Sequence, residues 1–190
     1  MDTKLVAAVG EVVARVAAEE VLPRFGRLAA REIEVKSDLP YDLVTVADRA
    51  AEAALAERLT ALLPGSVVVG EEAVADDPGI LAAIGGDQPV WIVDPIDGTF
   101  NYASGNPRFA ILAALVVDGE PVGSWTLAPA LGVSATATAG GGAFVNGVRV
   151  KTGGAKPLRG AVGRYRRPGD RRRRARPVLA QDQARGLALS

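Results

Sequence analysis

The stretch VWIVDPIDGT at residues 90–99 joins a short apolar run to an acidic turn. Its first four residues are typical of a buried strand, and we expect that strand to end abruptly at the Asp-Pro pair, because proline fixes φ and favours a turn. Gly98 permits close backbone approach, and we expect a short helical turn to begin near Thr99. The stretch therefore predicts a strand, an acidic turn and a helix start in direct succession.

Apolar runs on both sides of this stretch predict a sheet. Asp118-Gly119 and Asn146-Gly147 are strong signals for type I′ hairpin turns, so the strands that they join are antiparallel. Residues 133–139 alternate with period two, which is typical of a half-buried strand. The expected strands are residues 32–36, 67–69, 90–93, 109–117, 122–127, 133–139 and 143–150.

Two helices precede most of these strands. The first runs from about Thr3 to Val21 and has apolar residues at three- and four-residue steps. The second runs over residues 46–63, with Thr45 and Asp48 as a capping pair. The order predicts an α+β fold, a layered sandwich of two N-terminal helices packed on a largely antiparallel sheet.

The composition excludes several kinds of chemistry. The 190 residues include no Cys and no His, which rules out disulfides, cysteine nucleophiles, Ser-His-Asp hydrolysis and His-ligated metals. A bound metal must be held by oxygen, which favours Mg²⁺, Mn²⁺ or Ca²⁺. No signal peptide and no uncharged apolar run of roughly 18 residues is recognisable, so we expect a soluble cytoplasmic protein without membrane contact.

The charges divide the chain into two parts. Residues 1–158 carry 12 basic and 20 acidic side chains, a net charge of −8, whereas residues 159–190 carry 10 basic and 2 acidic ones, a net charge of +8. We therefore expect one folded domain over residues 1–157. The Arg-rich tail over residues 158–190 has no apolar period and is expected to be disordered.

Acidic residues follow two of the expected strands. Glu71 and Glu72 come after the first, and Asp94 and Asp97 come after the second. If these carboxylates converge, two unit charges about 4 Å apart cost roughly 4 kcal/mol at an effective dielectric of about 20. A divalent cation turns that cost into a gain, and hard oxygen ligands favour Mg²⁺.

Each feature also has a simpler interpretation. A Glu pair after a strand is usually solvated, and the acidic motif of residues 94–99 is also a good surface turn. Asp48 serves equally well as helix-cap support or as a partner of Thr99, and Lys36 is by default a solvated lysine at a strand end.

Five segments taken together resemble the inositol monophosphatase family in order and spacing. They are Lys36, DLVTVAD at 42–48, GEE at 70–72, WIVDPIDGT at 91–99 and GGGAFVNG at 140–147. The resemblance covers about residues 1–155 and rests on a specific combination of motifs. It implies the first half of a layered αβαβα fold and Mg²⁺-dependent hydrolysis of a small phosphomonoester such as inositol monophosphate.

The resemblance also assigns metal ligands. It implies that Glu71, Asp94 and the Ile96 carbonyl hold a first Mg²⁺, and that Asp94 and Asp97 hold a second, with Asp94 bridging. Two such ions can stabilise both the attacking and the leaving oxygen of an in-line displacement.

The remaining roles are implied in the same way. Glu71 and Thr99 orient the attacking water, and Asp48 supports Thr99. The backbone N–H groups of Gly98 and Thr99 grip the phosphate, and Lys36 is a supporting cation that lies near the substrate. The family also suggests a homodimer.

The chain departs from the family in its last part. Family members are longer, and their second half supplies a Trp-Asp motif, whereas Trp91 and Trp125 are followed here by Ile and Thr. One hypothesis is a truncated or frameshifted product whose turnover is impaired. Two alternatives are a non-catalytic remnant and a nucleic-acid-binding protein that uses the Arg-rich tail, although this tail has few aromatics for stacking. The sequence leaves the phosphomonoester substrate open.

Overall fold

The computed structural model describes residues 1–36, 43–153, 163–165 and 176–178. The chain separates into two compact units, Met1–Lys151 and Thr152–Ser190, so the first unit ends close to the predicted domain boundary at residue 157. The loop predicted over residues 37–42 lies outside the described residues.

A seven-stranded sheet forms the centre of the first unit, with the strand order β3-β4-β5-β6-β7-β8-β9. β3 pairs with β4 in parallel, and every other neighbouring pair is antiparallel, which confirms the prediction of a largely antiparallel sheet. The strands are β3 (Val67–Gly70), β4 (Val90–Asp97), β5 (Ala110–Val117), β6 (Glu120–Ala128), β7 (Val133–Thr138), β8 (Gly142–Val145) and β9 (Val148–Val150).

Both predicted hairpin turns are present. Asp118 and Gly119 have φ values of 52° and 75°, and Asn146 and Gly147 have φ values of 47° and 76°. Positive φ at both central residues is the requirement of a type I′ turn, which matches the right-handed twist of the strands it joins. The dipeptides therefore fix the register of β5 with β6 and of β8 with β9.

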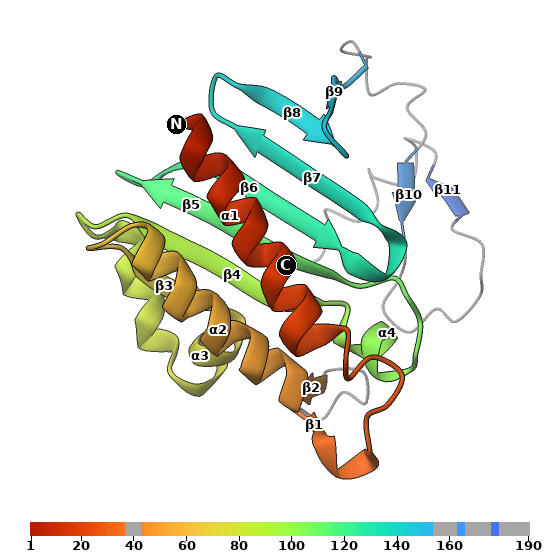
Figure 1. Ribbon diagram of the computed structural model, residues 1–190. Helices are drawn as coiled ribbons and strands as arrows, with labels where there is room; N and C mark the ends of the chain where they lie inside the picture. Colours follow the sequence, from red (N-terminus) through yellow and green to blue (C-terminus); the bar gives the residue numbers. More distant parts are fainter. Residues whose placement is uncertain (37–42, 154–162, 166–175, 179–190) are drawn as a thin grey trace. The chain divides into compact units, whose positions relative to one another are not determined.

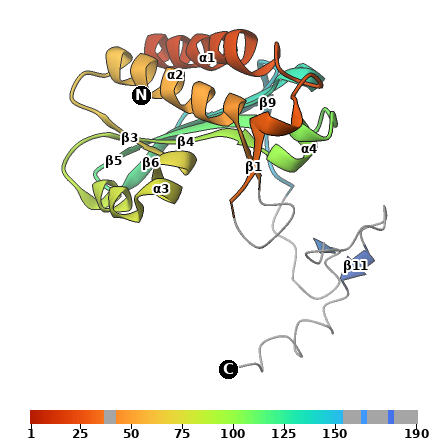
Figure 2. The same cartoon turned by 90° about the horizontal axis from the view of Figure 1, so that it is seen from below.

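Two long helices cover one face of the sheet, as Figures 1 and 2 show. α1 (Thr3–Val16) continues into a π-helical turn (Ala17–Val21), and α2 (Val46–Leu62) packs beside it. Their buried faces meet the sheet in one core, which includes Leu55, Trp91 and Trp125. This confirms the predicted helices and the layered arrangement.

β4 differs from the prediction. The strand does not end at the Asp-Pro pair but runs on to Asp97. Asp94 pairs with Leu112 and Asp97 pairs with Ala110, so two residues of β4 lie opposite one residue of β5. This is a β-bulge, and a bulge tolerates Pro95 because the ladder lacks a hydrogen bond there. The bulge, and not a turn, bends the acidic segment.

Short elements complete the first unit. α3 (Glu71–Asp76) and a 3₁₀ helix (Pro78–Gly85) lie on the opposite face near β3, and neither was predicted (Figure 2). α4 (Thr99–Ala103) confirms the helix start predicted at Thr99. The other short elements are β1 (Ile33–Val35) paired with β2 (Leu43–Thr45), and 3₁₀ turns at Ala30–Glu32 and Pro129–Leu131.

In the second unit, β10 (Gly163–Tyr165) pairs with β11 (Arg176–Val178) in antiparallel fashion. The rest of the Arg-rich tail lies outside the described residues, so the expectation of disorder over residues 158–190 stays a prediction. In the part of the chain that the structure describes, no helix combines the length and apolar character needed to cross a membrane.

Candidate metal and phosphate site

The parallel pair of β3 and β4 brings the predicted acidic residues to one edge of the sheet. Gly70, the last residue of β3, pairs with Val93 of β4. Glu71 and Asp94 therefore follow directly from paired positions in two neighbouring parallel strands. Since the two strands run in parallel and are in register here, Glu71 at the end of β3 lies close to Asp94 within β4.

Several features of the fold act on the ionisation of Asp94. Burial and, after it, the neighbouring charges of Glu71 and Asp97 together raise the pKa of Asp94 to about 8. The bulge adds a stabilising contact, because the Ile96 N–H donates to Asp94 Oδ1 at 3.1 Å. Glu71 and Asp97 therefore lie close enough to Asp94 for their charges to act on it.

Lys36 lies beside this cluster. Its Nζ donates to Glu71 Oε1 at 2.8 Å and to Glu72 Oε1 at 2.6 Å. Burial lowers the pKa of Lys36, but its hydrogen bonds and the charges of the two glutamates outweigh that effect and the pKa is raised. Burial also raises the pKa of Glu72, although Lys36 opposes the shift. The ammonium group thus neutralises part of the negative charge.

The carboxylates of Glu71, Asp94 and Asp97 are ligands of the kind that a hard divalent cation prefers. Their side chains are nevertheless not gathered around one point. Among the described residues, no three Asp or Glu side chains have an arrangement that would hold a metal ion as it stands. Burial, and after it the charges of Glu71 and Asp97, raise the pKa of Asp94, so its ionised form is disfavoured in the metal-free fold. A divalent cation would favour the ionised form, and it would bind Glu71 in competition with Lys36 or at the second carboxylate oxygen.

Asp48 links the start of α2 to the acidic segment. It is 1% exposed and accepts hydrogen bonds from Thr45 N at 2.8 Å and Thr45 Oγ1 at 2.5 Å. Its other oxygen, Oδ1, lies 3.1 Å from Thr99 Oγ1. Burial raises the pKa of Asp48, and these hydrogen bonds oppose the shift. The two roles considered for Asp48, helix cap and partner of Thr99, are therefore both present.

Thr99 is held on two sides. Besides Asp48 Oδ1, its hydroxyl oxygen lies 3.0 Å from the Ile96 carbonyl oxygen, so two acceptors share its single proton. The Ile96 side chain is fully buried in the core, which anchors this carbonyl. Gly98 has φ of 91°, and a Cβ at this position would lie 3.1 Å from the Arg108 carbonyl oxygen. Glycine is therefore required where the bulge turns into α4.

Glu52 is not among the residues predicted from the sequence. This residue of α2 is 9% exposed, and its carboxylate accepts hydrogen bonds from the backbone N–H groups of Glu72 at 2.8 Å and Ala73 at 2.9 Å. One signal was available, since Glu52 lies one turn after Asp48 and next to Ala51 on the buried stripe of α2. An acidic residue on that stripe requires buried partners.

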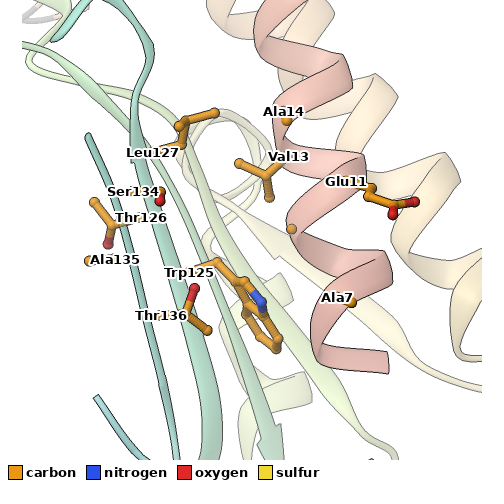
Figure 3. Close-up of a pocket in the computed structure, with 11 residues that line it drawn as sticks. Ala7, Glu11, Val13, Ala14, Trp125, Thr126, Leu127, Ser134, Ala135 and Thr136 are labelled. Atoms are coloured by element: carbon orange, nitrogen blue, oxygen red, sulfur yellow. The ribbon is translucent and has the colours of Figure 1, made fainter. Parts of the chain in front are cut away.

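A groove of about 440 Å³ lies elsewhere, between α1 and strands β6 and β7 (Figure 3). Trp125 and Thr136 line it from the sheet, and Glu11 lines it from α1. It shares no residue with the acidic cluster, and small apolar side chains make up much of its lining. The carboxylate chemistry therefore belongs to the edge of β3 and β4 and not to this groove.

Comparison with known proteins decides the family. The sequence model of the inositol monophosphatase family matches residues 2–186. The chain belongs to this family. The match extends beyond the motifs at residues 36–147 and takes in most of the Arg-rich tail.

Relatives and solved structures agree with this assignment to the inositol monophosphatase family. An inositol-1-monophosphatase from Rhizobium meliloti is 40% identical over 138 residues, which are 73% of this chain and 49% of the relative. An inositol monophosphatase from Dictyostelium discoideum is 38% identical over 129 residues, which are 68% of this chain and 45% of the relative. The structure of a Thermotoga maritima IMPase matches with a TM-score of 0.66 and 30% identity, covering 80% of this chain and 54% of that one.

The inositol monophosphatase fold predicted from the motifs is thus confirmed for the part that is present. The chain spans about half the length of the curated relatives that it matches. Its described residues supply the helix pair, the first sheet and the acidic segment.

Proposed function

We propose that this chain provides the Mg²⁺ and phosphate site of a small-molecule phosphomonoesterase. The main support is that Glu71 and Asp94 follow paired positions of two parallel strands, that the charges of Glu71 and Asp97 act on Asp94, and that Asp48 holds the Thr99 hydroxyl. A cluster of carboxylates next to a positioned hydroxyl is suited to metal-assisted hydrolysis. The membership of the chain in the inositol monophosphatase family supports the same class of reaction.

The proposed ligands are those that the family resemblance implies. Glu71, Asp94 and the Ile96 carbonyl would hold one Mg²⁺, and Asp94 and Asp97 would hold a second. Bound Mg²⁺ supplies positive charge that stabilises the attacking and leaving oxygens of a phosphoryl transfer. With no His in the chain, carboxylates and hydroxyls are the groups available to position a water.

The other side chains orient the reactants. Thr99 and Glu71 position the attacking water, and Asp48 keeps the Thr99 hydroxyl in place through the contact at 3.1 Å. The backbone N–H groups of Gly98 and Thr99 bind the phosphate. Lys36 adds a positive charge beside the site through its hydrogen bond to Glu71 Oε1.

Inositol 1-phosphate is the first substrate to test, because relatives that match the chain are named inositol monophosphatases. This chain spans about half the length of those relatives. Catalysis by this chain on its own is therefore also a proposal.

The direct test measures the melting temperature in EDTA and in Mg²⁺. At about 100 times Kd, ligand binding stabilises a fold by about 2.7 kcal/mol, which corresponds to about 5–10 °C for a chain of this size. Asp94→Asn should abolish the Mg²⁺-dependent rise, while Asp87→Asn, at an exposed acid outside the cluster, should retain it. The absence of a rise in the unaltered chain would refute the proposed metal site. Phosphate release from inositol 1-phosphate then tests turnover.

A further inference from the structure

Glu52 joins α2 to the first turn of α3. Both of its carboxylate oxygens are engaged, Oε2 by the Glu72 N–H at 2.8 Å and Oε1 by the Ala73 N–H at 2.9 Å. These are donors that a helix leaves without partners in its first turn. A carboxylate that accepts two backbone hydrogen bonds at the N-terminus of a helix stabilises that helix. For α3, this carboxylate comes from a different helix, α2.

Gly70 provides the space for this contact. It directly precedes α3, and a Cβ at this position would overlap the Glu52 carboxylate. Its φ of −100° and ψ of 154° are accessible to any residue, so the backbone conformation does not require glycine here. The glycine of the Gly-Glu-Glu motif is therefore needed because the Glu52 carboxylate occupies the position of a side chain.

α3 depends on such tertiary contacts. It contains only 6 residues, too few for a helix that is stable without outside support. Glu71 is its first residue, so the position of the Glu71 side chain follows the position of this first turn. A change in the hydrogen bonds of Glu52 therefore shifts the position of the Glu71 side chain.

The same face of α2 also holds the other acidic segment. Asp48 and Glu52 are four residues apart, which places them one turn apart on the helix. Asp48 lies 3.1 Å from the hydroxyl of Thr99, next to the bulge that carries Asp94 and Asp97. The two buried carboxylates of α2 thus fasten both segments whose acidic side chains form the cluster.

We propose that Glu52 is a positioning residue for the metal site. It acts by holding the first turn of α3 so that Glu71 faces Asp94 and Asp97, and Gly70 leaves the space that this contact requires. The inference rests on the proposed function, because it concerns the same cluster of ligands. Glu52 itself binds neither metal nor substrate. It sets the distance between Glu71 in α3 and the two ligands in β4, Asp94 and Asp97.

The first test measures Mg²⁺ affinity by titration calorimetry on the full chain. Glu52→Ala should weaken Mg²⁺ binding by at least about tenfold, within the range found when a partner that orients a metal ligand is removed. Glu52→Gln should have a smaller effect, because its remaining carbonyl oxygen still accepts one N–H and the chain is expected to stay folded. Glu57→Gln, an exposed site on the same helix, is the matched control and should bind Mg²⁺ as the unaltered chain does.

A double-variant cycle tests the contact itself. Gly70→Ala should weaken Mg²⁺ binding in the native background, because the new methyl group displaces the Glu52 carboxylate. In the Glu52→Ala background the same change should add little, since the carboxylate is no longer there. Fully additive effects of the two substitutions would overturn the proposal.

The outcomes separate this inference from the proposed function. If the Glu52 variants melt at lower temperature yet bind Mg²⁺ as tightly as the unaltered chain, Glu52 is only a helix cap and the inference is wrong. If the unaltered chain itself binds no Mg²⁺, the proposed function fails and the positioning role fails with it.

Discussion

At the scale of single residues, the roles of the acidic side chains are set by their neighbours. Asp48 is almost completely buried, but its hydrogen bonds to Thr45 and Thr99 compensate for the loss of water. Asp94 instead faces Glu71 and Asp97, and its pKa rises to about 8. Both are carboxylates, yet the first is structural support and the second is the candidate bridging ligand.

The raised pKa of Asp94 predicts how metal-free stability depends on pH. Burial and the neighbouring carboxylates raise this pKa from 3.8 in a free side chain to about 8 in the fold, so the folded chain favours the protonated form. The stabilisation from this proton is fully present below pH 3.8, and it is lost as the pH rises through about 8. In EDTA, urea unfolding should therefore show a free energy of unfolding that falls between about pH 4 and pH 8.

The comparison with Asp94→Asn isolates this effect, because burial raises the pKa of Asp48 and Glu72 as well. Asn does not titrate, so the variant should lose stability less steeply over the same range. Equal slopes in the two chains would contradict the assignment of the shift to Asp94.

Asp48→Asn should reduce both stability and activity. An amide in place of the carboxylate cannot accept all three hydrogen bonds from Thr45 and Thr99, so we expect a loss of about 1–2 kcal/mol in urea unfolding. Phosphate release should fall as well, because the Thr99 hydroxyl keeps the Ile96 carbonyl as an acceptor but loses the Asp48 carboxylate. Asp2→Asn, at the exposed N-cap of α1, is the control and should be nearly neutral, since Asn caps a helix as well as Asp does.

At the scale of elements, irregular segments shape the site. The bulge in β4 carries Asp94 and Asp97 around the buried Ile96 side chain, and α3 presents Glu71. The π-helical turn after α1 places the Val21 carbonyl 2.8 Å from the Tyr102 hydroxyl of α4. This hydrogen bond joins the helix layer to the segment that follows the acidic motif.

Tyr102→Phe should destabilise the fold by about 1–3 kcal/mol, because the buried Val21 carbonyl loses its donor while the ring packing is kept. Urea unfolding measures the change. Phe100→Leu, at a residue of α4 that is 51% exposed, should change the free energy of unfolding by less than about 0.5 kcal/mol. A neutral Tyr102→Phe variant would show that this contact does not connect the two elements.

At the scale of the whole molecule, the two units differ in charge and content. The first unit, Met1–Lys151, contains the core and the acidic cluster. The Arg-rich tail has a net charge of +8 over residues 159–190, opposite in sign to the rest of the chain. The charge asymmetry predicts that phosphate-rich polymers, if they bind at all, bind through the tail and in a salt-dependent way.

Deletion of residues 152–190 should leave the Mg²⁺-dependent rise in melting temperature unchanged, because every proposed ligand lies in the first unit. Any retention on a nucleic-acid column at low salt should disappear with the tail. Loss of the Mg²⁺ response would show instead that the tail, which the family match includes up to residue 186, contributes to the fold of the first unit.

Much of the architecture follows from local patterns. The apolar steps of residues 3–21, the capping pair at Thr45 and Asp48, and the two Asp-Gly and Asn-Gly turns predict elements that the structure confirms. The acidic motifs could be found as well, because their combination and spacing, rather than any one turn or acidic pair, resemble a single family. These signals depend on a few neighbouring residues, and such short-range preferences survive in the folded chain.

The sequence by itself determined the α+β class, the family and the identity of the acidic residues. Only the tertiary structure decided that β4 continues through Pro95, because the bulge depends on its pairing with β5. It alone showed that Glu52 supports α3 and that Lys36 binds Glu71, since these contacts join residues 20 to 35 positions apart. Local pattern carries no information about which buried donor a distant carboxylate will meet, because that depends on how helix and sheet pack.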